Sequence, residues 1–404
     1  MTINWEKIEA GTLIFTAASL PIGLAPANLG LGVGMLLVIR KLLVDSTTRK
    51  LIVGGITVPL LLYLGMYLTA TVFSKYQVNI AGFFEDKWVV SAYFVALGLS
   101  GSLVIMTRAL VIQIISGSVI AAYAILQFIT GYDIIRAKEL EPISGGYMAL
   151  GLFSHHLTYG GVALIIFVIA LTCLLFSKPK NYRNCLIFMT TVSGIGLVVS
   201  YARSAILGLG AAFLIFFLTA SSKMKLVLVG SAVVGVIGML VVMPGMSDRF
   251  MKTFKGGDES ETTRIRLWQT SAAMIGDHPM LGVGQSNFLY LFEKYKVPGY
   301  YDNHSHPHND MITIAVDGGI LTLLCFIGMW IVFFFKGTKL VLKLPHDSQK
   351  RWILLSGMAV AGSILVAGQF QNYLADAEVA NMVWFSVGIM FGLNSTTNTS
   401  ISDW

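Results

Sequence analysis

The chain has 404 residues, of which 55% are hydrophobic and only 12% are charged, and its mean hydropathy is +0.74. A soluble domain carries about 25% charged residues, so this chain cannot present a polar surface to water on every side. The composition excludes an ordinary soluble protein and predicts that lipid is its solvent. A net charge of +7 could indicate binding to nucleic acid. In a membrane protein, however, an excess of Lys and Arg is typical of the cytoplasmic loops, and we expect no nucleic-acid partner.

Long apolar runs follow one another along the whole chain. A helix needs about 20 apolar residues to cross roughly 30 Å of hydrocarbon, and twelve runs approach that length. The first run follows a short polar segment without a convincing cleavage site, so we expect its helix to be retained. We therefore predict an all-α polytopic membrane protein with about twelve transmembrane helices. The runs lie near residues 11–27, 28–44, 51–73, 88–106, 108–130, 157–177, 184–201, 204–220, 224–243, 311–335, 352–370 and 377–394.

Basic residues indicate the orientation of these helices, because short cytoplasmic loops hold an excess of Lys and Arg. If the N-terminus is inside, sixteen Lys and Arg residues fall in cytoplasmic segments and five in the short outer connections. The one long polar segment, between helices 9 and 10, then lies outside. We expect helices 1–9 within residues 1–243, an outer loop subdomain at 244–310, and helices 10–12 with a short cytoplasmic tail at 311–404.

Three histidines, His304, His306 and His308, alternate immediately before the apolar run that begins at residue 311. An imidazole with a pKa near 6.5 can act as a general base, and the positive end of the helix dipole would keep His308 neutral and able to accept a proton. Three alternating histidines could also bind a divalent metal, because they share one face of an extended segment. No further Cys or His cluster supplies a partner ligand for a metal. The alternative to both roles is a histidine-rich loop at the membrane interface that has no catalytic function and only solvates the start of the helix.

Arginines form the second group of candidates on the outer face. Arg203 lies in the short connection Ser200–Ser204 between two apolar runs. A charged side chain at the membrane boundary is energetically unfavourable, so its presence there indicates a functional role. The alternative is an anchor to lipid phosphates. Arg264 and Trp268 share one face of a helix predicted from about 262 to 276, which could instead lie on lipid headgroups. Arginines that converge at one membrane face would bind pyrophosphate well, because guanidinium binds phosphate oxygens bidentately.

Two of these segments resemble motifs of a known family. His308-Asn309, nine further positions, Gly319, two positions and Thr322 resemble the histidine signature of O-antigen ligases. The segment from Arg264 to Pro279 is similar to a loop motif that ligases share with O-antigen polymerases, in which an Arg precedes a Pro by fifteen positions. That spacing selects Arg264 over Arg266, and Arg203 is similar to the family's arginine at the outer end of a middle helix. The resemblance spans roughly residues 145–325.

The resemblance implies a multi-pass enzyme of the bacterial inner membrane, surrounded by membrane lipids, with its loop subdomain and active site facing the periplasm. Such an enzyme performs a metal-independent, inverting glycosyl transfer from an undecaprenyl-pyrophosphate-linked glycan and uses no cofactor. In a ligase the acceptor is a sugar hydroxyl of the lipid A core, which completes lipopolysaccharide. In a polymerase the acceptor is another lipid-linked repeat unit.

The resemblance also implies roles for individual residues. His308 is the general base that removes the proton of the acceptor hydroxyl, and His306 is the candidate for orienter or substitute base. Arg203 and Arg264 neutralise the pyrophosphate leaving group, with Arg266 as a further candidate for that contact. The remaining residues of the matched motifs, which we expect to have a structural role, are Trp268, Asn309, Gly319 and Thr322.

Three alternatives to a ligase stay open at this point. A polymerase would use the same lipid-linked donor. A protein O-oligosaccharyltransferase shares the loop motif but usually adds a C-terminal region after the last helix. A twelve-helix transporter or flippase is the non-enzymatic alternative, although polar residues gather at the outer boundary of this chain rather than at the midplane.

Overall fold

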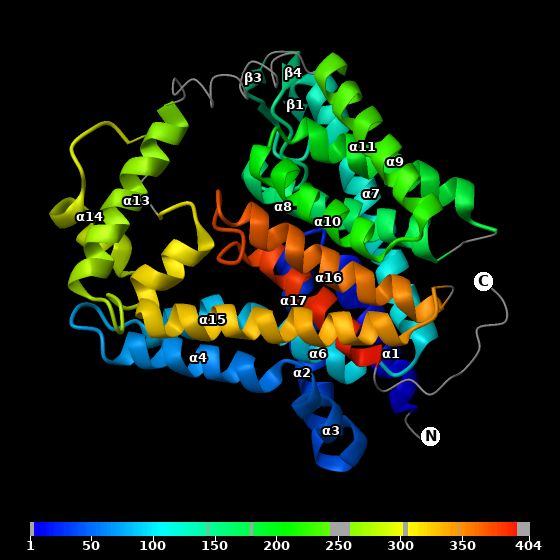
Figure 1. Cartoon of the computed structure of the whole chain (residues 1–404), viewed down its shortest axis with the longest axis horizontal. Coiled ribbons are helices and arrows are strands. Elements are labelled where there is room, and N and C mark those ends of the chain that lie inside the picture. The colour runs from blue at the N-terminus through cyan, green and yellow to red at the C-terminus, as the bar shows by residue number, and fades with distance from the viewer. Residues whose placement is uncertain are drawn as a thin grey trace.

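The computed structural model describes residues 4–143, 145–177, 181–242, 259–301, 306–346 and 348–393 (Figure 1). Helices make up most of these ranges, and the described strands are only two residues long. The helices are α1 (Trp5–Ser19), α2 (Leu24–Val44), α3 (Ser46–Gly54), α4 (Thr57–Val72), α5 (Ile80–Lys87), the 3₁₀ turn η1 (Trp88–Val90), α6 (Ser91–Leu99), α7 (Leu103–Thr130), α8 (His156–Phe176), α9 (Arg183–Val199), α10 (Arg203–Thr219), α11 (Ser222–Val242), α13 (Glu259–Asp277), α14 (Asn287–Tyr295), α15 (Asp310–Lys343), α16 (Gln349–Ala367) and α17 (Ala377–Gly392).

Helices cover all twelve predicted runs, but fewer of them are long enough to cross a bilayer alone. Among the described residues, five helices have the necessary length and hydropathy, namely α2, α7, α8, α15 and α16. A sixth span is possible if α3 and α4, which meet at a 65° bend, are counted together. The helices α9, α10 and α17 are apolar but shorter. The prediction of an all-α polytopic membrane protein is therefore confirmed, while the count of twelve spans stays a prediction.

Helix boundaries differ from the predicted ones between the first two apolar runs, near residue 27, and between the runs 88–106 and 108–130. The first break falls at residues 20–23 rather than at 27, because Pro21 cannot continue a helix and Gly23 adopts a φ of 152°. The predicted run 88–106 is interrupted after Leu99, and α7 begins only when the Ser102 side chain accepts a hydrogen bond from the Ile105 N–H (3.3 Å). Hydropathy alone does not locate such breaks, since apolar residues continue through them.

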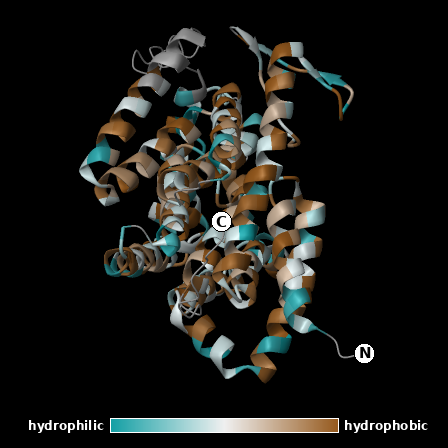
Figure 2. Cartoon of the chain, turned by 90° about the vertical axis from the view of Figure 1, so that its right-hand side faces the viewer, coloured by the Kyte–Doolittle hydropathy of each residue, from teal (hydrophilic) through white to brown (hydrophobic). Residues whose placement is uncertain are grey.

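The inner helices are buried within the protein and the outer ones expose apolar residues. Residues Val379 to Gly392 of α17 are all buried, and α17 packs against α6 and α16. By contrast, Leu226 on α11 and Leu342 on α15 are 77% and 79% exposed. Figure 2 shows hydrophobic colour on many outward-facing turns of the helices. Such a surface suits a hydrocarbon solvent, so burial and composition agree.

Two small antiparallel hairpins follow α7 on the same side as the start of α8. In the first, β1 (Tyr132–Asp133) pairs with β2 (Lys138–Glu139), and in the second β3 (Pro142–Ile143) pairs with β4 (Gly146–Tyr147). The buried side chain of Gln127 supports the segment that follows them. Its Nε2 donates to the Gly151 carbonyl (3.0 Å), and its Oε1 accepts from the N–H groups of Leu150 and Gly151 (3.0 and 2.8 Å).

The helices α13 and α14 form a small subdomain beside the N-terminal part of α15 (Figure 1). Its core consists of buried apolar residues from α13, α14 and the segment between them, and it includes Val316 of α15. Within the predicted loop subdomain 244–310, residues 244–258 and 302–305 lie outside the described ranges. The boundaries of that subdomain, and its position outside the membrane, stay predictions.

Gly319 interrupts α15 and allows the subdomain to dock there. Its φ of 73° and ψ of −179° break the helix, and a Cβ atom at this position would lie 2.2 Å from the Met280 carbonyl oxygen. The backbone groups that the break frees are satisfied by the segment after α13: the Val283 N–H donates to the Val316 carbonyl (2.8 Å), and the Ile320 N–H donates to the Pro279 carbonyl (2.8 Å). The helix break at Gly319 therefore provides the place at which the segment after α13 docks on α15.

Candidate active site

The starts of α8, α10, α15 and α17 meet at one end of the helical body, around the connection 368–376 that joins α16 to α17. The Thr158 hydroxyl of α8 donates to the Asp376 carboxylate (2.5 Å), and the Ser204 hydroxyl of α10 lies 3.0 Å from the Tyr373 hydroxyl. The Asp310 N–H at the start of α15 donates to the Gly368 carbonyl (2.7 Å). The predicted topology assigns all these ends to the outer face. We call residues 368–376 the outer connection.

His308 is held in an unusual backbone conformation next to this outer connection. Its φ is 53°, a left-handed value that few residues other than glycine adopt. Its Nδ1 atom lies 2.8 Å from the Gln371 side-chain oxygen Oε1. An amide oxygen can only accept a hydrogen bond, so with this arrangement Nδ1 carries the hydrogen and Nε2 presents a lone pair. The geometry suits a proton acceptor at Nε2.

His306 has a different protonation pattern. Its ring lies 4.2 Å from the ring of His308, centroid to centroid, and its Nδ1 accepts a hydrogen bond from the His308 N–H (3.2 Å). Burial, together with the proximity of His308 and His155, lowers the pKa of His306 to about 4. His306 is therefore neutral at pH 7, with its hydrogen on Nε2, and it can donate a hydrogen bond there.

The side chains that flank His308 fix the start of α15. The Asn309 side-chain oxygen accepts a hydrogen bond from the Ile312 N–H (2.9 Å) and so caps the helix, while its Nδ2 donates to the Gln369 carbonyl (2.9 Å). The Trp268 indole N–H donates to the Pro307 carbonyl (2.9 Å). Asn309 and Trp268 thus secure both sides of the His308 backbone, one from the outer connection and one from α13.

Two of the predicted arginines lie at the same end of the protein. Arg203 begins α10, and its guanidinium lies 3.5 Å from the Glu261 carboxylate of α13. Arg264, one turn further along α13, acts on Tyr373: burial raises the pKa of Tyr373, and the positive charge of Arg264 opposes that rise. Because Arg203 contacts Glu261 (3.5 Å), and Glu261 lies one helical turn before Arg264 on α13, the two arginines lie near each other at this end of the protein.

Arg266 does not join this group. Its guanidinium donates to the Tyr300 carbonyl (2.8 Å) and covers Gly299. The helical periodicity of α13 explains the difference, because residues two positions apart point in different directions. The arginine that the motif spacing selects is therefore the one that the structure places near Arg203.

The remaining motif residue, Thr322, closes the helix break rather than facing the site. Its hydroxyl donates to the Gly318 carbonyl (2.6 Å), and its side chain is fully buried. His304, the third member of the hypothetical metal site, lies outside the described residues. Within the ranges that the structure describes, no group of three or more His, Cys, Asp or Glu side chains is arranged to hold a metal ion.

Sequence reasoning missed the residues that complete the site. Gln371, Tyr373 and Glu261 were not singled out, although Gln369 to Tyr373 form a polar and aromatic segment between two apolar runs, which is a recognisable signal. It also missed a buried polar group deeper on α15. There the Tyr67 hydroxyl donates to the Asp317 carboxylate (2.7 Å), and the Lys87 ammonium lies 4.4 Å from the centre of the Tyr67 ring.

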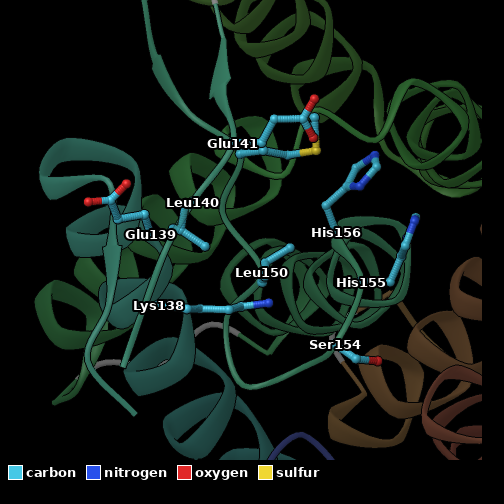
Figure 3. A pocket seen from close by; sticks show the side chains of 9 residues that line it. Lys138, Glu139, Leu140, Glu141, Leu150, Ser154, His155 and His156 are labelled. Carbon is cyan, nitrogen blue, oxygen red and sulfur yellow. The ribbon is translucent and has the colours of Figure 1, made fainter. Parts of the chain in front are cut away.

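A cavity of about 370 Å³ lies beside the histidines, at the two hairpins and the start of α8 (Figure 3). His155 and His156, whose rings lie 4.6 Å apart, form one wall of it. The His155 Nδ1 atom accepts a hydrogen bond from the Leu157 N–H (3.1 Å) and so caps α8. Thr158, on the first turn of α8, donates to Asp376 of the outer connection (2.5 Å), and Gln371 of that connection contacts His308 (2.8 Å), so the cavity and the base candidates lie at the same end of the protein.

Comparison with known proteins agrees with the motifs. Residues 186–327 match the family model described as O-antigen ligase. The chain is also 25% identical, over 167 residues, to a protein from Rickettsia conorii that is provisionally named a polysaccharide ligase. That similarity covers 38% of this chain and 39% of the relative. The matched region, residues 186–327, contains Arg203, Arg264 and His308, which lie at the same end of the structure, and this region of the chain is similar to O-antigen ligases.

Proposed function

We propose that this protein is an O-antigen ligase, which transfers a glycan from an undecaprenyl-pyrophosphate carrier to a sugar hydroxyl of the lipid A core. The observation that carries the proposal is the grouping of His308, Arg203 and Arg264 at one end of the helical body. A positioned imidazole and two permanent positive charges are what a glycosyl transfer with a pyrophosphate leaving group requires. The name of the Rickettsia relative supports a ligase over a polymerase.

The mechanism assigns one bond change to each part of the site. His308 Nε2 removes the proton of the acceptor hydroxyl, and the resulting oxygen attacks the anomeric carbon of the donor from the face opposite the pyrophosphate. The bond between that carbon and the pyrophosphate oxygen breaks, so the configuration at the carbon inverts. The carrier leaves as undecaprenyl pyrophosphate, and the proton stays on His308 until solvent takes it. No cofactor enters this sequence.

Positive charge at the leaving group comes from two kinds of source. Arg203 and Arg264 can each bind phosphate oxygens bidentately, and this is stronger than a contact from a point charge. Arg203 also begins α10, whose first N–H groups and positive dipole end favour an anion. The Ala202 side chain cannot cap that helix end. The pyrophosphate therefore has both guanidinium and backbone donors at one place, which supports a reaction without a metal ion.

The proposal includes a location and an orientation. The carrier lipid and the lipid A core require a multi-pass enzyme of the inner membrane with its site on the periplasmic side, in agreement with the distribution of Lys and Arg. Reporter fusions at Lys180 and Gly257 test this orientation. Fusions that report the same side of the membrane would contradict it.

A glycan gel from a deletion strain tests the function. Loss of a ligase leaves complete lipid A core without long chains, whereas loss of a polymerase leaves core that carries single repeats. Loss of a flippase removes both. A deletion strain with single-repeat caps, or with unchanged long chains, would overturn the ligase proposal.

A further inference from the structure

The cavity beside His155 has no role in the transfer described so far. It is lined by β2 and the two residues that follow it, by residues 148 and 150, and by residues 154–156 at the start of α8. Its volume of about 370 Å³ lies in the range of small-molecule sites, which is about 300–1,000 Å³. The lining residues are Lys138, Glu139, Leu140, Glu141, Met148, Leu150, Ser154, His155 and His156.

The walls of the cavity are fixed by contacts outside it. Buried Gln127 holds Leu150 and Gly151 through three hydrogen bonds. The first hairpin is closed by Arg136, whose guanidinium lies 2.7 Å from the buried Asp133 carboxylate, and the Tyr123 hydroxyl donates to that same carboxylate (2.8 Å). A polar cavity with a supported wall is pre-organised, so a ligand would not have to order it on binding.

The chemistry of the lining favours sugar hydroxyls over phosphate. The residues that line the cavity carry two carboxylates, one ammonium group, one hydroxyl and two imidazoles, together with apolar side chains, so the lining offers both donors and acceptors. Within the described part of the chain, Lys138, Glu139 and Glu141 form no ion pair with one another or with a neighbour, and these side chains remain available to a ligand. Two carboxylates against one lysine would repel a pyrophosphate, which has its own arginines.

The cavity lies next to the part of the site that holds His308, because the start of α8 and His308 both contact the outer connection: Thr158 donates to Asp376 (2.5 Å), and Gln371 contacts His308 (2.8 Å). The proposed pyrophosphate site consists of Arg203 and Arg264 on α10 and α13, whereas the lining of the cavity comes from the hairpins and the start of α8 and includes neither arginine. A glycan whose hydroxyl reaches His308 from the side of His155 places its neighbouring sugar over this cavity. We propose that the cavity binds an uncharged sugar ring of the acceptor glycan, next to the sugar that carries the reacting hydroxyl. This inference rests on the proposed function.

The test measures transfer by the purified full-length protein in lipid nanodiscs. The probes are undecaprenyl-pyrophosphate-linked glycan and the core lipopolysaccharide extracted from a strain that lacks the gene. The first variant is Glu141→Gln, since Glu139 lies on the side away from the two histidines in Figure 3. The second is Ser154→Tyr, which fills the cavity with a ring. The matched control is Glu293→Gln, whose carboxylate is 74% exposed on α14.

We expect Glu141→Gln and Ser154→Tyr to raise the KM for the acceptor at least about tenfold, because hydrogen bonds to a charged group are lost or blocked. The KM for the donor and the slow hydrolysis of the donor by water should stay at the wild-type values, as should every parameter of Glu293→Gln. Unchanged acceptor KM in both variants overturns the inference, and a raised donor KM shows that donor sugars occupy the cavity instead. Absence of transfer by the wild-type protein counts against the proposed function itself.

Discussion

The Nδ1 atom of His308 lies 2.8 Å from the Oε1 atom of Gln371, a residue 63 positions further along the chain. This contact selects the tautomer of the imidazole, because the amide oxygen accepts the Nδ1 hydrogen and leaves Nε2 as the basic nitrogen. The contact also ties the base to the outer connection, which Asp310 and Asn309 hold in place.

Replacing Gln371 by glutamate should change the pH dependence of transfer. A carboxylate next to the Nδ1 hydrogen stabilises the imidazolium, so the pKa of His308 rises. His308 acts as a base only when it is neutral, so the acidic limb of the kcat profile should move to higher pH, by about one pH unit. Burial raises the pKa of Asp376 to about 7, so this carboxyl group titrates in the same pH range as the imidazole. The position of the acidic limb is therefore compared between Gln371→Glu and the wild-type protein, which both contain Asp376. Gln371→Leu should lower kcat without this upward movement, and an unmoved limb in Gln371→Glu would contradict the contact.

Removing the imidazole of His308 should abolish transfer. A positioned base contributes roughly 10²- to 10⁴-fold, so His308→Ala should lose at least about 10²-fold in kcat while its thermal unfolding stays close to that of the wild type. His306→Ala should lose less of the kcat. The Nδ1 atom of His306 already accepts the hydrogen bond from the His308 N–H, and the pKa of His306 is about 4, so His306 is a weak base. If His308→Ala retains activity and His306→Ala is inactive, the general base is His306 instead of His308.

The two arginines near the outer connection should differ from Arg266. Arg203→Ala and Arg264→Ala should each reduce transfer by about 10²-fold or more, and the lysine variants should recover only part of it, because a point charge replaces a bidentate group. Arg266→Ala serves as the control, since that guanidinium contacts the Tyr300 carbonyl. Glycan ladders from complemented strains, at matched expression, provide the measurement. Wild-type ladders from both the Arg203 and Arg264 alanine variants would favour a lipid-anchor role.

Glu261 should compete with the donor for Arg203. The two groups lie 3.5 Å apart and their side chains are 19% and 29% exposed, so the pair contributes less than about 1 kcal/mol. Glu261→Gln removes the competing charge, and the KM for the lipid-linked donor should fall about two- to fivefold. A variant such as Glu293→Gln, with its carboxylate on α14, controls for the general loss of negative charge. A raised donor KM would show that Glu261 orients Arg203 instead of competing for it.

Gly319 should tolerate no side chain, whereas Gly328 on the same helix should. Alanine at position 319 would have to adopt a φ of 73° with its Cβ 2.2 Å from the Met280 carbonyl oxygen. Such a backbone costs about 1–3 kcal/mol even without the close contact, so Gly319→Ala should unfold at a clearly lower temperature in detergent. Nothing lies within 4 Å of a Cβ at Gly328, and Gly328→Ala should keep its unfolding temperature or raise it. Equal unfolding temperatures for the two variants would argue against the helix break.

Much of the site could be predicted from the sequence because the signals are local. The spacing from Arg264 to Pro279 and from His308 to Gly319 indicated the resemblance to O-antigen ligases, which the match of residues 186–327 to that family model bears out. Those same residues lie at one end of the structure. Alternation alone could not choose between His306 and His308, since both are imidazoles on one short segment. Motif spacing also could not show that Gly319 breaks α15, because the apolar run continues through it.

The sequence by itself determined that lipid surrounds this chain and which residues carry the family motifs, because composition, run length and spacing depend on neighbours along the chain. Only the tertiary structure decided that Gln371 and Tyr373 complete the site, that Arg266 faces Tyr300, and that a polar cavity borders His155. Those relationships join elements tens to hundreds of residues apart. They depend on how α8, α10, α13, α15 and the outer connection dock, and side-chain packing between helices specifies that docking.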